Sequence, residues 1–193
     1  MIDETRKKNV VVFMADGMEM CECLLTVDIL MRAGVNVIKA SVMDSLEITS
    51  SHQVKVLADV LAEDVDFDDV DMIVLPGGRI GSENLAASNI VAHQCIDFAA
   101  AGKKIAAVCA APSVFAGLGL LDGRKATCHP DFEDKVEYGG AHLTHESVTV
   151  DDNIITGQGL GATMDFALTL AEILTDETES TRIAKSICYR YWE

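Results

Sequence analysis

The sequence predicts an α/β fold in which helices cover both faces of a mostly parallel sheet. Strand and helix patterns alternate along all 193 residues, with short connections between them. Strand segments such as 10–14 and 105–108 are continuous apolar runs, as expected where both faces of a strand are buried. Alternation of this kind produces parallel strands joined by crossover helices. We expect a single domain over residues 1–193.

The composition agrees with one globular domain that has a well-filled core, and it argues against proteins that bind nucleic acids or anionic membranes. The chain is 49% hydrophobic with three prolines, which suits one globular domain. Its formal net charge of −16 argues against nucleic-acid and anionic-membrane partners. No apolar run is long enough for a bilayer span, and the charged start lacks a secretion signal. Six cysteines without a disulfide-like spacing favour a reducing, cytoplasmic compartment.

The first half of the chain predicts four strands and two helices. The strands are 10–14, 35–42, 54–57 and 71–75. The helices are predicted from their apolar faces, which contain Leu24, Val27 and Met31 before a stop near Gly34, and Val91, Cys95 and Phe98 before Gly102. The acidic stretch 63–71 between them is expected to be a solvated loop or the start of a strand.

The second half of the chain predicts a strand that ends at Cys109, followed by further strands and two helices. We expect strands at 105–108 and 125–128, then a hairpin of 148–150 and 153–156 around Asp151-Asp152. Two helices close the chain, at about 163–174 and near 180–191. No repeat or linker divides it.

The stretch 104–112 has the pattern of a nucleophile elbow written with cysteine. A buried strand ends on Cys109, and Pro112 stands in the first turn of the next helix, where its missing N–H costs nothing. Helix-opening N–H groups and the positive end of the dipole favour thiolate over thiol. The alternative is a free cysteine packed as a small hydrophobe.

Three corners of the predicted sheet fall on one rim, beyond the carboxyl ends of its strands. They are the turn after Met14, the turn Pro76-Gly77-Gly78, and Cys109. Glycine lets backbone N–H groups approach a developing oxyanion, so Gly77 and Gly78 are candidate donors. Ala110, directly after the nucleophile, is the natural second donor. A simple turn is the alternative interpretation of Pro-Gly-Gly.

Candidate acid–base partners for Cys109 are Glu19, Glu22 and His129. A carboxyl beside the cysteine corner would be partly desolvated, so its pKa would rise and it could share a proton with the sulfur. Acidic residues also simply favour helix N-termini, which is the alternative for either glutamate. His129 ends a predicted strand directly before a proline and is a plausible base.

Nothing in the sequence predicts a metal or a cofactor. His142-x-x-His145 and Cys21-x-Cys23 each lack a matching second pair, and positions two apart on a helix diverge. Gly157-x-Gly159-x-Gly161 lacks the spacing of a dinucleotide fingerprint.

The motifs taken together resemble the ThiJ/PfpI superfamily, and most closely the DJ-one branch, in a bacterial-type member. They are Ala15-Asp-Gly-Met-Glu-Met-Cys-Glu22, Val74-Leu-Pro-Gly-Gly78, Ala106-Ala-Val-Cys-Ala-Ala-Pro112, Cys128-His-Pro130 and Thr156-Gly-Gln-Gly-Leu-Gly161. The similarity runs over nearly the whole chain, in order and with comparable spacing.

The resemblance implies a flavodoxin-like α/β/α sandwich and a homodimer without a cofactor. It implies that Cys109 is the reactive cysteine, that Glu22 rather than Glu19 is its hydrogen-bonding glutamate, and that His129 is the nearby histidine. Gly78 and Ala110 would supply the oxyanion N–H groups. The implied activity is a glyoxalase or deglycase acting on methylglyoxal-type α-oxoaldehydes or glycated side chains.

Two other activities are open to this family. One is an oxidative-stress sensor or redox-regulated chaperone in which Cys109 is oxidised to a sulfinate. The other is a cysteine peptidase, which ranks last because such relatives carry a histidine where Ala110 stands.

The chain departs from the family pattern at two points. Leu160 replaces the proline of the usual late Gly-Pro-Gly motif, which puts the shape of the pocket loop in doubt. An auxiliary cysteine found in many members is missing from the stretch 49–53.

Overall fold

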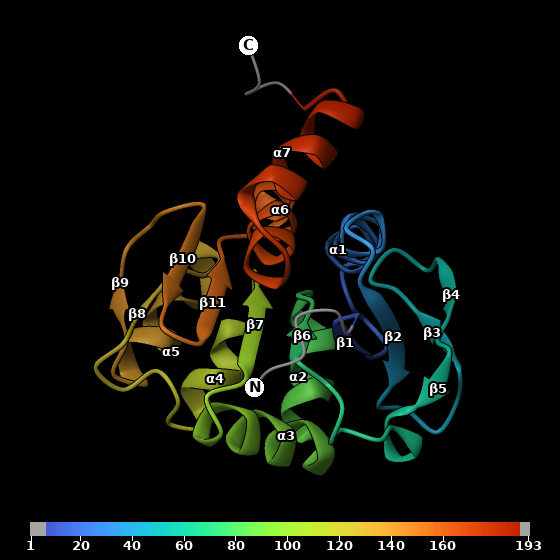
Figure 1. The fold of residues 1–193 in the computed structure, drawn as a ribbon. Coiled ribbons are helices and arrows are strands. Elements are labelled where there is room, and N and C mark those ends of the chain that lie inside the picture. The colour runs from blue at the N-terminus through green and yellow to red at the C-terminus, as the bar shows by residue number, and fades with distance from the viewer. Residues whose placement is uncertain (1–6, 190–193) are drawn as a thin grey trace.

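A seven-stranded sheet forms the centre of the molecule in a computed structural model that describes residues 7–189 (Figure 1). Across the sheet the strands are β10 (Val148–Asp151), β11 (Ile154–Gly157), β7 (Lys104–Val108), β6 (Met72–Leu75), β1 (Asn9–Met14), β2 (Asn36–Ser41) and β5 (Val60–Leu61). Every neighbouring pair is parallel except the β10–β11 hairpin. The predicted α/β fold is therefore confirmed, and so is the hairpin.

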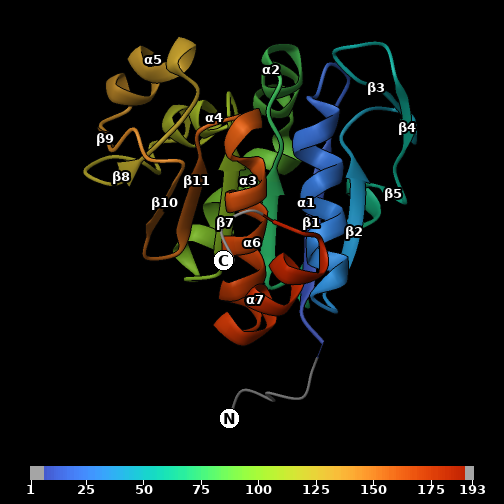
Figure 2. The same ribbon diagram turned by 90° about the horizontal axis from the view of Figure 1, so that it is seen from above.

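Helices cover both faces of this sheet, which makes a three-layer sandwich (Figures 1 and 2). One face carries α1 (Met20–Arg32), α6 (Thr163–Leu174) and α7 (Glu177–Ser186). The other carries α2 (Arg79–Ala87), α3 (Asn89–Ala100) and α4 (Pro112–Gly117). Each layer closes over its own apolar cluster, because the side chains of β1, β6 and β7 alternate between the two faces.

Small elements complete the fold outside the main sheet. β3 (Glu47–Thr49) pairs with β4 (Lys55–Leu57), and β8 (Lys125–Ala126) pairs with β9 (His142–Leu143). The remaining helices are α5 (Glu133–Tyr138) and the short 3₁₀ helices η1 (Ala62–Asp64), η2 (Pro130–Phe132) and η3 (Leu160–Ala162).

The predicted apolar face of the first helix was right for Val27 and wrong for its other two residues. Leu24 and Met31 are 38% and 59% exposed, and the helix packs through Cys23 and Leu30 together with Val27. That set has the spacing i, i+4, i+7, which is as regular as the predicted one. Only the position of the sheet selects between them.

Several predicted boundaries also differ from the structure. The helix expected after Gly78 is two helices, because the Ser88 hydroxyl accepts a hydrogen bond from the Val91 N–H and starts a new one. The strand expected at 54–57 lies outside the main sheet as β4, and the one at 125–128 ends at residue 126. The last helix ends at Ser186, and residues 190–191 of its predicted span lie outside the described residues.

Within residues 7–189 no helix has the length and apolar character needed to cross a membrane.

Candidate active site

Cys109 lies at a strained corner between β7 and α4. Its φ angle is +65°, a conformation that costs a non-glycine residue about 1–3 kcal/mol. Two backbone hydrogen bonds hold it there: the Cys109 N–H donates to the Gly157 carbonyl, and the His129 N–H donates to the Cys109 carbonyl, both at 2.9 Å. Pro112 opens α4 at its first turn. The predicted elbow is therefore present in the backbone.

Glu22 reaches this corner from the first turn of α1. Glu22 is only 1% exposed, and its Oε2 accepts a hydrogen bond from the Gly77 N–H at 3.0 Å. The other oxygen, Oε1, is buried with no hydrogen-bond partner among the described residues. The Cys109 thiol and this carboxyl are close enough for each to change the pKa of the other. Glu22 is thus held against the sulfur by the fold itself.

Glu19 lies before the first turn of α1 and does not have the role of Glu22. It is the N-cap of α1 rather than part of its first turn, and its Oε2 accepts the Glu22 N–H at 2.7 Å. Capping by a carboxylate satisfies a free helix N–H and fixes where the helix starts. Glu19 therefore sets the position from which Glu22 reaches Cys109.

The two glycines after β6 are required by close packing. A Cβ on Gly77 would collide with Glu22 Oε2 and would lie 2.6 Å from Cys109 Cβ. Gly78 has φ +91°, and a Cβ there would lie 2.6 Å from the Glu19 backbone nitrogen. Both positions exclude larger residues because three corners of the sheet meet here.

The predicted oxyanion donors divide into two roles. The backbone N–H groups of Gly78 and Ala110 lower the pKa of the Cys109 thiol, which places them at the sulfur. The Gly77 N–H already donates a hydrogen bond to Glu22. The prediction that Gly77 is an oxyanion donor was therefore wrong. Gly77 positions the acid, and the other two N–H groups face the nucleophile.

Burial raises the pKa of both partners of the Glu22–Cys109 pair. The pKa of Glu22 rises from 4.5 to about 7, mainly through burial and further through the charge of Glu19, against hydrogen bonds from Cys109 and Gly77. Burial and the carboxylate of Glu22 raise the pKa of the Cys109 thiol to about 12, although the N–H groups of Gly78 and Ala110 lower it. The lowered thiol pKa expected from the helix N-terminus is therefore not observed.

The pair must consequently be treated as one titrating unit. It loses its first proton near pH 7 and keeps the second throughout the physiological range. In the singly protonated pair, the remaining proton can reside on sulfur or on the carboxyl. The second arrangement is a thiolate that accepts a hydrogen bond from a neutral Glu22, which removes the carboxylate charge that opposes thiolate formation.

His129 lines the space in front of the sulfur. It lies in the loop that follows β8, at the N-cap of η2, where its Nδ1 accepts the Asp131 N–H at 3.2 Å. A neutral imidazole with an accepting Nδ1 carries its hydrogen on Nε2. The Thr127 N–H donates to the Thr156 hydroxyl at 2.9 Å, which ties this loop to β11.

Cys109, Glu22 and His129 open into one cleft of about 580 Å³. Its remaining walls are lined by Glu19 at the start of α1, Pro130 in η2, Ser147 before β10, and the segment 158–162 after β11. A Cβ added to Gly159 would lie 3.6 Å from His129 and 3.9 Å from the Cys109 sulfur. The glycine-rich loop is therefore the face of the cleft opposite the nucleophile.

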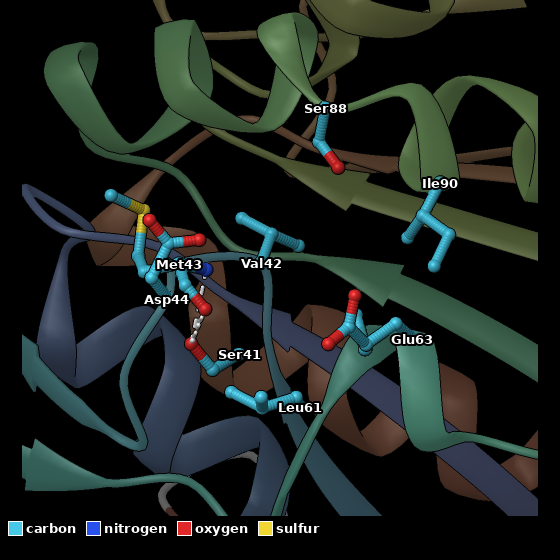
Figure 3. A pocket seen from close by; sticks show the side chains of 9 residues that line it. Ser41, Val42, Met43, Asp44, Leu61, Glu63, Ser88 and Ile90 are labelled. Atoms are coloured by element: carbon cyan, nitrogen blue, oxygen red, sulfur yellow. Dashed lines mark hydrogen bonds between the residues drawn. The ribbon is translucent and has the colours of Figure 1, made fainter.

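A second hollow of about 280 Å³ lies at the end of β2 and shares no lining residue with the cleft at Cys109 (Figure 3). Asp44 lines it from the segment after β2, Glu63 from η1, and Ser88 and Ile90 from the start of α3. No cysteine or histidine lines it among the described residues.

The residues considered and set aside as metal ligands differ in their surroundings. Cys23 is buried and Cys21 exposed, while His145 pairs through Nδ1 with Glu133 at 3.1 Å. Among residues 7–189 there is no group of three or more His, Cys, Asp or Glu side chains arranged to hold a metal ion.

Comparison with known proteins places the chain in a family. Residues 8–173 match the DJ-1/PfpI family. The chain belongs to that family. It is 37% identical over 179 residues to Protein DJ-1 homolog B of Arabidopsis thaliana, and this match covers 92% of the chain but only 40% of that longer relative.

Further relatives match over their whole length. The crystal structure of Drosophila melanogaster DJ-1beta superposes with a TM-score of 0.93 at 32% identity, over 96% of this chain and all of that one. The protein named glutathione-independent glyoxalase DJR-1.2 of Caenorhabditis elegans is 27% identical over 95% of this chain and 97% of its own length.

Proposed function

We propose that the protein is a cofactor-independent glyoxalase that converts methylglyoxal-type α-oxoaldehydes to 2-hydroxy acids. The observation that carries this proposal is the Cys109–Glu22 pair: a nucleophile and a buried carboxyl that together hold one proton near neutral pH. The relative named as a glutathione-independent glyoxalase supports the same reaction class. Removal of early glyoxal adducts from side chains is the related deglycase activity.

The first step is attack of the Cys109 thiolate on the aldehyde carbon, which forms a carbon–sulfur bond. The carbonyl electron pair moves to oxygen, and the developing oxyanion accepts hydrogen bonds from the Gly78 and Ala110 N–H groups. The proton on Glu22 then neutralises the oxyanion. The product is a hemithioacetal, and Glu22 is left as a carboxylate.

The second step moves hydrogen between the two carbons without any external oxidant. Glu22, assisted by His129, removes the proton from the former aldehyde carbon, and a proton returns to the neighbouring carbon. The former aldehyde carbon is oxidised to a thioester while the ketone carbon is reduced to an alcohol. Water then hydrolyses the thioester, which releases lactate and restores the thiol.

The test is lactate formation from methylglyoxal by wild type, Cys109→Ser and Glu22→Gln, with Cys188→Ser as a control at an exposed cysteine. We expect activity in wild type and the control, at least about a thousandfold loss in Cys109→Ser, and about a hundredfold loss in Glu22→Gln. A purified wild type that forms no lactate would refute the glyoxalase proposal.

We keep oxidation sensing as a second candidate because the same groups suit an oxidised sulfur. The Gly78 and Ala110 N–H groups and a protonated Glu22 are hydrogen-bond donors that would stabilise the oxygens of a Cys109 sulfinate. Mild peroxide should then add two oxygens to Cys109 ahead of the other cysteines. Peptide mass analysis that finds Cys95 or Cys188 oxidised first would exclude this role.

A further inference from the structure

We propose that Arg79 is a positioning residue for His129 and acts on it through Asp131. The inference deepens the proposed function and rests on it, because that mechanism gives His129 a part in the proton transfer. Arg79 follows Gly78 directly and begins α2, so its backbone is fixed to the corner that faces the sulfur.

Arg79 occupies a position that its own helix does not favour for a cation. It is the first residue of α2, whose first turn contains no acidic residue and whose N-cap, Gly78, has no side chain to cap it. The positive end of a helix dipole repels a cation placed there. The charge of Arg79 is therefore balanced by another part of the fold.

The balancing group lies in η2, which Arg79 contacts twice. The Arg79 Nη2 lies 3.1 Å from Asp131 Oδ2, and the guanidinium lies over the Phe132 ring, with Cζ 5.0 Å from the ring centroid. An ion pair of this kind contributes little to stability by itself, and the contact with the ring adds a second attachment. One side chain thus joins the start of α2 to two successive residues of η2.

The conformation of η2 in turn sets the direction of the His129 ring. The backbone of His129 is fixed separately, since its N–H donates to the Cys109 carbonyl and the following Pro130 favours the extended conformation that it adopts. The ring is held by the Asp131 N–H, which donates to its Nδ1 at 3.2 Å. This hydrogen bond keeps the hydrogen of the neutral imidazole on Nε2. Its loss would let the ring turn and would permit the other tautomer.

Ring ¹⁵N spectra of His129 at pH 8.5 test this role without any substrate. The change is Arg79→Met, which keeps the stem of the side chain and removes the guanidinium. The ratio of the Nε2–H tautomer to the Nδ1–H tautomer should fall about fivefold. Arg182→Met is the matched control, because Arg182 pairs with Glu179 at 2.6 Å on α7, on the opposite face of the sheet from α2 (Figure 1). Its ratio should equal that of wild type, and an unchanged ratio in Arg79→Met overturns the proposal.

The variant Asp131→Asn tests whether the effect passes through the ion pair. Asparagine keeps the backbone N–H that binds His129 and loses the charge that binds Arg79, so the tautomer ratio should fall about threefold. Arg79→Met and Asp131→Asn combined should have the effect of Arg79→Met alone, because both remove the same ion pair. A combined effect of about fifteenfold, the product of the two, would mean that the residues act independently and would overturn the proposal.

Turnover of methylglyoxal separates failure of this inference from failure of the glyoxalase proposal. In Arg79→Met, kcat should fall about fivefold with KM unchanged, since the ring acts in the proton transfer and not in binding. If wild type forms no lactate, the glyoxalase proposal fails while the tautomer ratio still decides whether Arg79 orients His129. If wild type forms lactate and Arg79→Met has the same kcat, Arg79 does not position His129 for the reaction and the proposal is overturned.

Discussion

Cys109 and Cys95 are two thiols with the same raised pKa and different surroundings, Cys95 buried and Cys109 only partly buried. The pKa of each is about 12, raised by burial in Cys95 and by burial together with the Glu22 carboxylate in Cys109. Cys95 lies in α3 among apolar side chains, and burial is the sole cause of its shift. Cys109 has in addition a carboxyl that can hold a proton, two N–H donors and an open cleft. A buried thiol becomes a nucleophile only where the fold also supplies a place for its proton and a path for its target.

The largest expected difference between the two thiols is in alkylation of the native protein. With iodoacetamide at pH 7.5, Cys109 should react at least about a hundredfold faster than Cys95, because only Cys109 is accessible and has a proton acceptor beside it. Peptide mass analysis over time measures both rates. In 8 M urea the two should react alike, and persistence of the difference there would mean that folding is not its cause.

A smaller effect follows from the close packing at Gly77. Alanine there would push on Glu22 and Cys109, so Gly77→Ala should lower the free energy of unfolding by about 2 kcal/mol. Gly117→Ala is the matched control, since no atom lies within 4 Å of the added Cβ. It should raise stability by about 0.5 kcal/mol, because alanine favours helix. Urea denaturation curves measure both, and equal effects would contradict the packing described.

The elbow could be predicted from the sequence because its signals are local. An apolar run, a cysteine, small residues and Pro112 specify a strand, a tight corner and a helix start. The choice of Glu22 over Glu19 came from the family resemblance, since both lie at the start of the same helix. The structure gives the physical reason: Glu19 turns back to cap α1, and Glu22 faces β6 and β7.

What could not be predicted depends on groups that are distant in the sequence. The raised thiol pKa results from burial and from a carboxyl 87 positions away, neither of which a strand–turn–helix pattern contains. The role of Gly77 also depends on a contact with α1. The division of the predicted helix into α2 and α3 at Ser88 did have a local signal, a serine before an apolar run. It was missed because the apolar periodicity around it also fits one continuous helix.

The ionisation of Glu22 should change the free energy of unfolding by an amount similar to that of Gly77→Ala, but in a way that depends on pH. Its pKa is about 7 in the folded protein and near 4.5 when unfolded, so the folded state binds the proton more tightly. The stabilisation from this proton is complete below about pH 4.5 and is lost as the pH rises through 7. The stability of wild type relative to Glu22→Gln should therefore fall by about 2 kcal/mol between pH 5 and pH 8. Urea denaturation at both pH values measures it, and a constant difference would mean that Glu22 titrates normally.

The pH dependence of Cys109 alkylation in wild type and Glu22→Gln tests most directly whether the two residues share a proton. In wild type the rate with iodoacetamide should rise through an inflection near pH 7, where the pair loses its first proton. In Glu22→Gln the thiol must ionise alone in a buried site, so the inflection should move above about pH 8 and the rate at pH 7.5 should fall about tenfold. An inflection that stays near pH 7 with an unchanged rate would contradict the shared proton.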